Sequence, residues 1–481
     1  MIFTYIIGCA LIIGCLIFLP QRVKADEVDD YVKIQMQKRS IPGLQLAVVR
    51  DGRIVKTQSY GVASLELNAP VNKDTMFEIA SNSKQFTAGA IMLLVQDRKL
   101  RLDDGITQYL SGLPQTYNAI TIRQLLNHTA GVKDYIEEFE LNRRLDYTSP
   151  ELVERVGANE LNFPPAENAK YSTTNYLLLG LIIEQITGKP YGEFLQERIF
   201  KPLGMSKTRV INIAEIIPNR ATGYKFENGV LRNGRYVAQT LRAAADIGLM
   251  TTALDMVKWD AALNTNKIFS PTAIDAMFTP AKLKNGSFAY SDWNTHFGLG
   301  WFIDDYFGHR NINHGGTFIT GFEAEISRYV DEKFTIIILA NRGQSDLYTM
   351  GMSIAGILNP ALRIPHQLKP QPDLKPQRSQ KLKQFLSSVS SGAVDSEQMT
   401  EGFRARFGSN QKDDITDFME DLKLFSYIDC KNVEKRGIER IGFPIKNLCS
   451  YKVVTGQKTH FVTFYLTEQD KVADIWIYSN D

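Results

Sequence analysis

The stretch Ser81-Asn82-Ser83-Lys84 decides the fold and the chemistry that we predict for this chain. A helical pattern begins at Ser81 and runs to about Val95, with small residues at 88–90. Residues three apart share one face of a helix, so the Lys84 ammonium can reach the Ser81 hydroxyl. A serine in the first turn also lies at the positive end of the helix dipole, which favours developing negative charge. Ser81 is therefore a candidate nucleophile.

This spacing is a weak signal by itself. Ser409-Asn410-Gln411-Lys412 repeats it, and we interpret that copy as a solvated helix start. An isolated serine before a helix is ordinarily an N-cap. Two further motifs distinguish Ser81: Tyr171-Ser172-Thr173 precedes a strongly apolar helix, and His314-Gly315-Gly316-Thr317 precedes a predicted strand. The chain has no G-x-S-x-G motif, so an α/β-hydrolase lacks its signature here.

Taken in this order, the three motifs resemble the serine β-lactamase-related hydrolases, which include class C β-lactamases, carboxylesterases of the same fold, D-aminopeptidases and DD-peptidases. The resemblance covers about residues 28–360. Its supporting stretches are Ile41-Pro42-Gly43, Leu125-Leu126-Asn127-His128-Thr129-Ala130-Gly131, Tyr176-Leu177-Leu178-Leu179-Gly180, Pro202-Leu203-Gly204-Met205 and Gly298-Leu299-Gly300-Trp301. It implies a β-lactamase/DD-peptidase-like α/β (α+β sandwich) fold, with an antiparallel sheet and an all-helical subdomain.

The resemblance also implies roles for individual residues. Ser81 would accept the acyl group, and the backbone N–H groups of Ser81 and Thr317 would form the oxyanion hole. Gly315 and Gly316 would leave space for substrate along the strand. A serine hydroxyl is a poor nucleophile without a base, and either Lys84 or Tyr171 can take its proton. Burial would lower the pKa of Lys84, and an ammonium beside Tyr171 would lower the pKa of Tyr171. The identity of the base therefore stays open.

Two positions depart from the family pattern. Thr173 stands where the family usually has an asparagine that contacts the substrate, and its hydroxyl is shorter than an amide. His314 stands where true β-lactamases have a lysine, and a histidine is nearly neutral at pH 7. Both changes disfavour efficient β-lactam hydrolysis. We expect His128 to be a structural residue that closes a turn.

The pattern along the chain agrees with a sheet built from distant segments. Asp51-Gly52 between two apolar alternating runs predicts a hairpin. Helices are predicted at 120–126, 151–156, 175–187, 191–199 and 254–264, and antiparallel strands at 299–304, 324–328 and 334–340. Strands therefore lie at both ends of this region and helices fill its middle.

We predict four regions: a leader at 1–25, the hydrolase domain at 26–360, a proline-rich semi-rigid linker at 361–378 and a small α+β domain of unknown role at 379–481. In the last region helices are expected at 381–389 and 414–424, and strands at 451–454, 460–466 and 472–477. Residues 2–20 carry no charge, and Val23-Lys24-Ala25 fits a signal-peptidase site. We therefore expect export to the periplasm or the exterior, with an uncleaved membrane anchor at 2–20 as the alternative.

Two of the four cysteines, Cys430 and Cys449, lie outside the leader. In an exported protein they either form a disulfide or stay two separate buried thiols. The chain has no CxxC motif and its six histidines are scattered, so we predict no metal and no cofactor. The net charge of +2 over 481 residues argues against a nucleic-acid partner. The expected partner is a small ester, amide or peptide substrate, including cell-wall-derived ones, and the oligomeric state is left open.

The function expected from the sequence is that of an exported serine hydrolase. It would act through a Ser81 acyl-enzyme on esters or amides, as a carboxylesterase does. One alternative is a D-amino-acid peptidase, a penicillin-binding DD-peptidase-like enzyme or a β-lactamase. Another is a catalytically degenerate binding scaffold that kept the fold, which Thr173 favours and the set Ser81, Lys84 and Tyr171 opposes.

Overall fold

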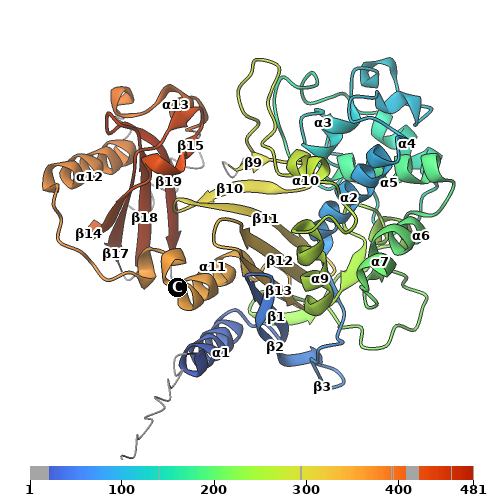
Figure 1. Cartoon of the computed structure of the whole chain (residues 1–481), viewed down its shortest axis with the longest axis horizontal. Coiled ribbons are helices and arrows are strands. Elements are labelled where there is room, and N and C mark those ends of the chain that lie inside the picture. The colour runs from blue at the N-terminus through green and yellow to red at the C-terminus, as the bar shows by residue number, and fades with distance from the viewer. Residues whose placement is uncertain are drawn as a thin grey trace, which may run out of the picture.

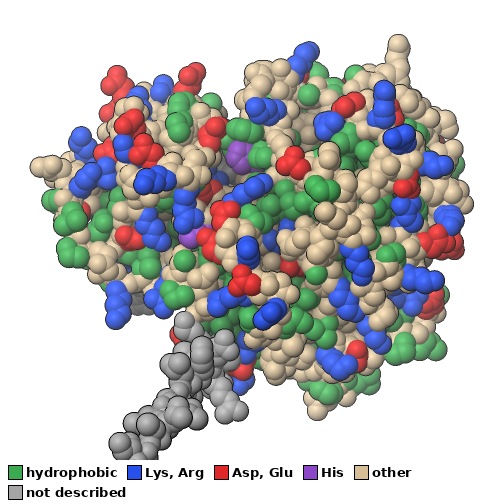
Figure 2. Space-filling model, in the orientation of Figure 1, with side chains coloured by type: hydrophobic (Ala, Val, Ile, Leu, Met, Phe, Trp, Pro, Cys, Tyr) green, Lys and Arg blue, Asp and Glu red, His purple; other side chains and the backbone are tan. Residues whose placement is uncertain are grey.

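The computed structural model describes residues 21–479 except 140, 293–294, 392, 394, 408–421 and 457. Residues 1–20 of the predicted leader at 1–25 and the second Ser-x-x-Lys stretch at 409–412 lie outside the described residues. Residues 21–25 of that leader belong to the first helix, Gln21–Lys38. Figure 1 shows a central sheet, a helix-rich part on one side of it, and a smaller C-terminal part on the other. Acidic and basic side chains are interspersed over the face seen in Figure 2.

The central sheet has eight antiparallel strands in the order β3-β2-β1-β13-β12-β11-β10-β9. The predicted hairpin is confirmed, because β1 and β2 pair across Asp51-Gly52. On its other side β1 pairs with β13, with Arg50 opposite Phe334, so the two ends of the hydrolase region meet in one sheet. The strands are β1 (Gly43–Arg50), β2 (Arg53–Ser64), β3 (Ala69–Pro70), β9 (His296–Phe297), β10 (Phe302–Tyr306), β11 (His309–Phe318), β12 (Phe322–Tyr329) and β13 (Phe334–Ala340).

The period of two along β1 and β13 buries both faces of the sheet. Leu46 and Ile338 face a core formed with α1 (Gln21–Lys38) and α11 (Leu347–Leu358). Ala47 and Ile337 face the larger core of the helix-rich part. The helices of that part are α2 (Lys84–Gln96), α3 (Ile122–Leu126), α4 (Ser149–Gly157), α5 (Thr173–Thr187), α6 (Tyr191–Leu195), α7 (Lys201–Leu203), α8 (Gln239–Arg242), α9 (Ala253–Leu263) and α10 (Pro271–Met277).

The predicted α+β architecture is confirmed, with a helix-rich part against an antiparallel sheet. Two small sheets accompany the helices, so that part is not helical throughout. One joins β4, β8 and β5, and the other is the hairpin of β6 and β7. Short extended segments satisfy their backbone groups where the chain crosses between helices. Their bounds are β4 (Phe77–Glu78), β5 (Arg209–Val210), β6 (Tyr224–Glu227), β7 (Val230–Asn233) and β8 (Leu249–Thr251).

The C-terminal part is a four-stranded antiparallel sheet in the order β14-β17-β18-β19, covered by helix α12. Cys430 and Cys449 are directly opposed on neighbouring strands and are joined by a disulfide. The predicted helix at 414–424 lies mostly outside the described residues, and its last residues belong to a strand. The elements are α12 (Pro376–Ser390), α13 (Glu401–Arg406), β14 (Leu422–Asn432), β15 (Glu439–Arg440), β16 (Phe443–Pro444), β17 (Asn447–Thr455), β18 (Lys458–Leu466) and β19 (Val472–Ser479).

The segment predicted as a linker at 361–378 packs against the folded parts. Leu362 and Ile364 are buried in the α1–α11 core, the Gln371 N–H donates to the Ile428 carbonyl, and α12 begins at Pro376. Proline content predicted a semi-rigid linker, and it could not reveal that Leu362 and Ile364 anchor the segment in the core. Among the described residues, no helix combines the length and the apolarity that crossing a bilayer requires.

Candidate active site

Ser81 lies at the junction between a 3₁₀ turn, Ala80–Ser83, and helix α2, which begins at Lys84. The expectation that Ser81 sits in the first α-helical turn is therefore corrected. Ala80, at the start of this turn, has a left-handed backbone with φ of 46°, so no helix continues through it in the N-terminal direction. The turn still brings the predicted pair together, because Lys84 Nζ donates to Ser81 Oγ at 3.1 Å.

Lys84 is fully buried although it carries an ammonium group. Nζ also donates to the carbonyl oxygen of Asp246 at 3.1 Å, and it lies 5.1 Å from the centre of the Tyr171 ring. The Asp246 carboxyl is buried nearby and accepts a 2.8 Å hydrogen bond from the Tyr135 hydroxyl. Burial raises the pKa of Asp246 to about 6, while the charge of Lys84 acts in the opposite direction. Asp246 thus belongs to the site, and sequence reasoning missed it because it lies outside every motif.

Tyr171 is held beside Lys84 by aromatic stacking. Its ring stacks on His128 with centroids 4.5 Å apart, and on Phe302 at 5.9 Å. His128 Nδ1 accepts from the Ser172 N–H and from Asn175 Nδ2, each at 3.2 Å. Burial, together with the charge of Lys84, lowers the pKa of His128 well below 6.5. His128 is therefore a neutral support that fixes the Tyr171 loop, which agrees with its expected structural role.

Thr173 opens helix α5 and is only 4 % exposed. Its backbone N–H donates to Asp134 Oδ2 at 2.6 Å, so Asp134 fixes the start of the helix directly after Tyr171. Asn175 cannot replace the missing family asparagine in this arrangement, because its amide is bound to His128. A contact between Thr173 and substrate stays a prediction. Asp134 is a second residue that the motif search did not reveal.

Strand β11 lies directly against the Ser81 turn. Asn82 Nδ2 donates to the His314 carbonyl at 2.5 Å. A Cβ at Gly316 would lie 2.3 Å from the Ile79 carbonyl oxygen and 2.9 Å from the Ser81 nitrogen, so only glycine permits this approach. The next residue, Thr317, is exposed at the end of the strand. The backbone therefore brings β11 beside the Ser81 N–H, the arrangement that an oxyanion hole requires.

His314 lies on the same face of β11 as Gly316 and is 2 % exposed. Burial, and then the charge of Lys84, lowers the pKa of His314 to about 3. The imidazole is therefore neutral at pH 7. His314 does not supply the fixed positive charge that a lysine would give at this position. Within the described ranges, no three His, Cys, Asp or Glu side chains are arranged to hold a metal ion.

The geometry agrees with what comparison with known proteins shows. The Beta-lactamase family profile matches residues 28–355. The chain is 31 % identical over 328 residues to Penicillin-binding protein 4* of Bacillus subtilis, covering 65 % of this chain and 70 % of that protein. It is 26 % identical over 322 residues to Protein flp of Staphylococcus aureus strain MW2, covering 66 % of this chain and 62 % of the length of that relative.

Solved structures show the same fold. The D-amino acid amidase from Ochrobactrum anthropi SV3, complexed with L-phenylalanine amide, has a TM-score of 0.59 and 27 % identity, covering 70 % of this chain and 100 % of that one. The octameric penicillin-binding protein homologue from Pyrococcus abyssi has a TM-score of 0.61 and 21 % identity, covering 92 % of this chain and 96 % of that one. The chain therefore belongs, over residues 28–355, to the serine β-lactamase-related hydrolase family.

Proposed function

We propose that this protein hydrolyses small amides or esters through an acyl-enzyme on Ser81. The observation that carries the proposal is the buried Lys84 ammonium, 3.1 Å from Ser81 Oγ, beside a strand packed against the Ser81 N–H. An ordinary surface serine has neither a buried cation nor backbone donors at its hydroxyl. The likeness to an amidase that acts on amino acid amides supports small acyl compounds as the substrate class.

The reaction follows from the groups in place. Ser81 Oγ loses its proton either to Lys84 as a neutral amine or to the Tyr171 phenolate beside a Lys84 ammonium, and attacks the substrate carbonyl carbon. The Ser81 and Thr317 N–H groups stabilise the resulting oxyanion, an interaction worth about 2.7–4 kcal/mol for one donor. The C–O or C–N bond to the leaving group then breaks, and the proton passes to that group. Water attacks the ester of Ser81, which releases the acid and restores the serine.

Two features bear on substrate and location. The neutral His314 lacks the fixed charge for a β-lactam carboxylate, so we propose that β-lactam hydrolysis is weak in this protein.

The Cys430–Cys449 disulfide supports export, because such bonds persist in oxidising compartments. Export agrees with the uncharged run at 2–20. We propose that this run is a leader that is removed, with a membrane anchor as the alternative.

The test is intact-protein mass spectrometry after incubation with a fluorophosphonate probe. Wild type should gain one adduct, and Ser81→Ala none. Lys84→Met and Tyr171→Phe should each slow labelling, and the group that acts as base should cost about 10²–10⁴-fold. Lys99→Met, which changes an exposed lysine just beyond α2, should label at the wild-type rate. An adduct that persists in Ser81→Ala, or none in folded wild type, would contradict the proposal and favour a binding scaffold.

Substrate class is decided with the same variants. Short-chain nitrophenyl esters, D- and L-amino acid amides and labelled penicillin should be compared side by side. Turnover of esters or amides without a lasting penicillin adduct is the expected result. A stable penicilloyl adduct would instead place the protein among the penicillin-binding peptidases, and rapid penicillin hydrolysis would contradict the role assigned to His314.

A further inference from the structure

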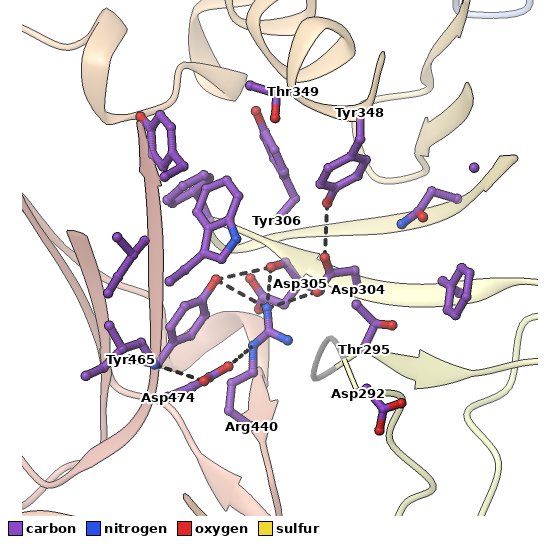
Figure 3. A pocket seen from close by; sticks show the side chains of 18 of the residues that line it. Asp292, Thr295, Asp304, Asp305, Tyr306, Tyr348, Thr349, Arg440, Tyr465 and Asp474 are labelled. Atoms are coloured by element: carbon purple, nitrogen blue, oxygen red, sulfur yellow. Dashed lines mark hydrogen bonds and ion pairs between the residues drawn. The ribbon is translucent and has the colours of Figure 1, made fainter. Parts of the chain in front are cut away.

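A cavity of about 670 Å³ lies between the central sheet and the C-terminal part (Figure 3). Strands β10 to β12 and helix α11 form one wall, and β19 with Arg440 and Tyr465 forms the other. Successive side chains along a strand point to opposite faces. Gly316 faces Ser81, so Gly315, which lines the cavity, faces the other way. The cavity thus lies behind the strand that borders the active site, and Phe302, which stacks on Tyr171, separates the two.

The lining of this cavity is aromatic and acidic. Nine aromatic residues line it, among them Tyr348, Trp476 and Tyr478. Five lining residues carry carboxyl groups, whereas the described lining has a single cation, Arg440. Aromatic faces and carboxylates both attract positive charge, and an apolar pocket with a few polar groups is the usual form of a small-molecule site.

The guanidinium of Arg440 is hydrogen-bonded to residues of both cavity walls. Its guanidinium donates to Asp304 Oδ1 at 2.9 Å, to the Asp305 carbonyl at 2.7 Å and to the Tyr465 hydroxyl at 3.2 Å. Figure 3 shows it between β10 and the C-terminal part, where it joins the two walls. The Asp305 carboxyl accepts from the Gly308 N–H instead. Arg440 therefore holds the cavity together and leaves the carboxyl of Glu325 without a counter-charge.

Glu325, from β12, lines the cavity, and none of these Arg440 hydrogen bonds reaches its carboxyl group. Its side chain is 3 % exposed, and Ser327 donates to its Oε1 at 2.6 Å. Its Oε2 points at Gly315, where a Cβ would be 2.9 Å away, and the hydrogen bond described for this carboxyl is the one from Ser327 to Oε1. Burial raises the pKa of Glu325 to about 8, and the Glu323 and Asp346 carboxylates add to the shift. At pH 7 the folded protein therefore keeps the proton of this carboxyl, and a cation beside Oε2 would stabilise the ionised form, so cation binding releases that proton.

We propose that the cavity binds an organic cation, an ammonium group on an apolar body, with the ammonium at Glu325 and the body against the aromatic rings. Such a ligand satisfies both features of the lining. An anion would meet an excess of carboxyl groups, and a neutral apolar molecule would leave Glu325 Oε2 unpaired. The C-terminal part supplies one wall of the site, which gives that part a role independent of Ser81 chemistry.

The test uses isothermal titration calorimetry on the full chain with benzyltrimethylammonium. Its neutral isostere, neopentylbenzene, has carbon in place of the charged nitrogen. We expect saturable binding of the cation, and Glu325→Gln should weaken that binding by about tenfold or more, because the variant cannot place a negative charge beside the ammonium. Glu193→Gln, which changes an exposed carboxylate away from the cavity, should bind as wild type does.

A second variant keeps the test decisive if Glu325→Gln does not fold. Trp476→Leu removes a ring from the cavity wall, and it should weaken binding of the cation without abolishing folding. Ser81→Ala should bind the cation as wild type does, which separates this inference from the proposed hydrolase. Equal binding of the cation and its neutral isostere, no saturable binding, or equal affinities in the Glu325 and Glu193 variants would overturn the proposal.

Discussion

At the scale of single residues, burial determines which groups carry charge. Burial and Lys84 lower the pKa of His128 and His314 far enough that both rings are neutral at pH 7. The cationic side chain nearest Ser81 is therefore Lys84, whose Nζ donates to Ser81 Oγ and to the Asp246 carbonyl. Sequence motifs identified Lys84 but could not predict Asp246, because a single aspartate far along the chain has no local pattern.

Glu325 gives a prediction for stability against pH. Its pKa is about 8 in the folded protein and near 4.5 in the unfolded chain. Between these values the unfolded chain loses the proton and the folded protein keeps it, so the free energy of unfolding falls as pH rises and levels off above about 8. Glu325→Gln removes this component while leaving an acceptor for Ser327.

Urea unfolding of wild type and Glu325→Gln from about pH 5 to about pH 8.5 measures this component. The difference in unfolding free energy between the two should move in favour of the variant as pH rises. Glu193→Gln serves as the control, because it changes an exposed carboxylate. A difference that is constant across the range would show that Glu325 titrates normally.

At the scale of elements, the approach of β11 to the Ser81 turn decides the reactivity of the site. The apolar periodicity predicted the helices and strands on either side of this contact, because those patterns are local. It could not predict that Ser81 leaves the helix. The left-handed backbone of Ala80 and the hydrogen bond from Asn82 to β11 are tertiary features.

Gly316→Ala tests this contact. The new methyl group would overlap the Ile79 carbonyl, so β11 must move away from Ser81 and the oxyanion donors separate. Losing one such donor costs about 10²–10³-fold in rate, and we expect fluorophosphonate labelling to slow by about that factor. Gly351→Ala, in α11, has its nearest neighbour at 3.6 Å and should label normally. Wild-type labelling of Gly316→Ala would contradict the contact as described.

At the scale of the whole molecule, the chain forms two parts that each have a core. Arg440, the packed segment after α11, and Trp476 and Tyr478 against the α1–α11 core are among the contacts that join them. The fold of the hydrolase region could be predicted because its motifs resemble a known family. The C-terminal part carried no motif, so only α12 and the strands β17, β18 and β19 were predicted, and β14 was missed. Its cavity depends on aromatic residues that come together from both parts.

The disulfide provides a prediction at this scale. Replacing both Cys430 and Cys449 with serine opens a crosslink across 19 residues, which should lower the stability of the C-terminal part by about 3 kcal/mol. Because the disulfide lies within that part, Ser81 should label at the wild-type rate. Calorimetry should show the change in one unfolding transition. Loss of labelling in the folded variant would show that the two parts depend on each other more closely.

The pairing of β1 with β13 has a consequence for folding while the protein is being synthesised on the ribosome. Arg50 of β1 is opposite Phe334, and the ladder extends to the pair of Leu44 and Ala340. At ribosomal speeds of about 5–20 residues per second, β1 waits roughly 15–60 s for its neighbour to emerge. During that time its apolar edge is open to other chains. Chaperone occupancy and losses to aggregation should therefore concentrate in nascent chains shorter than about 340 residues.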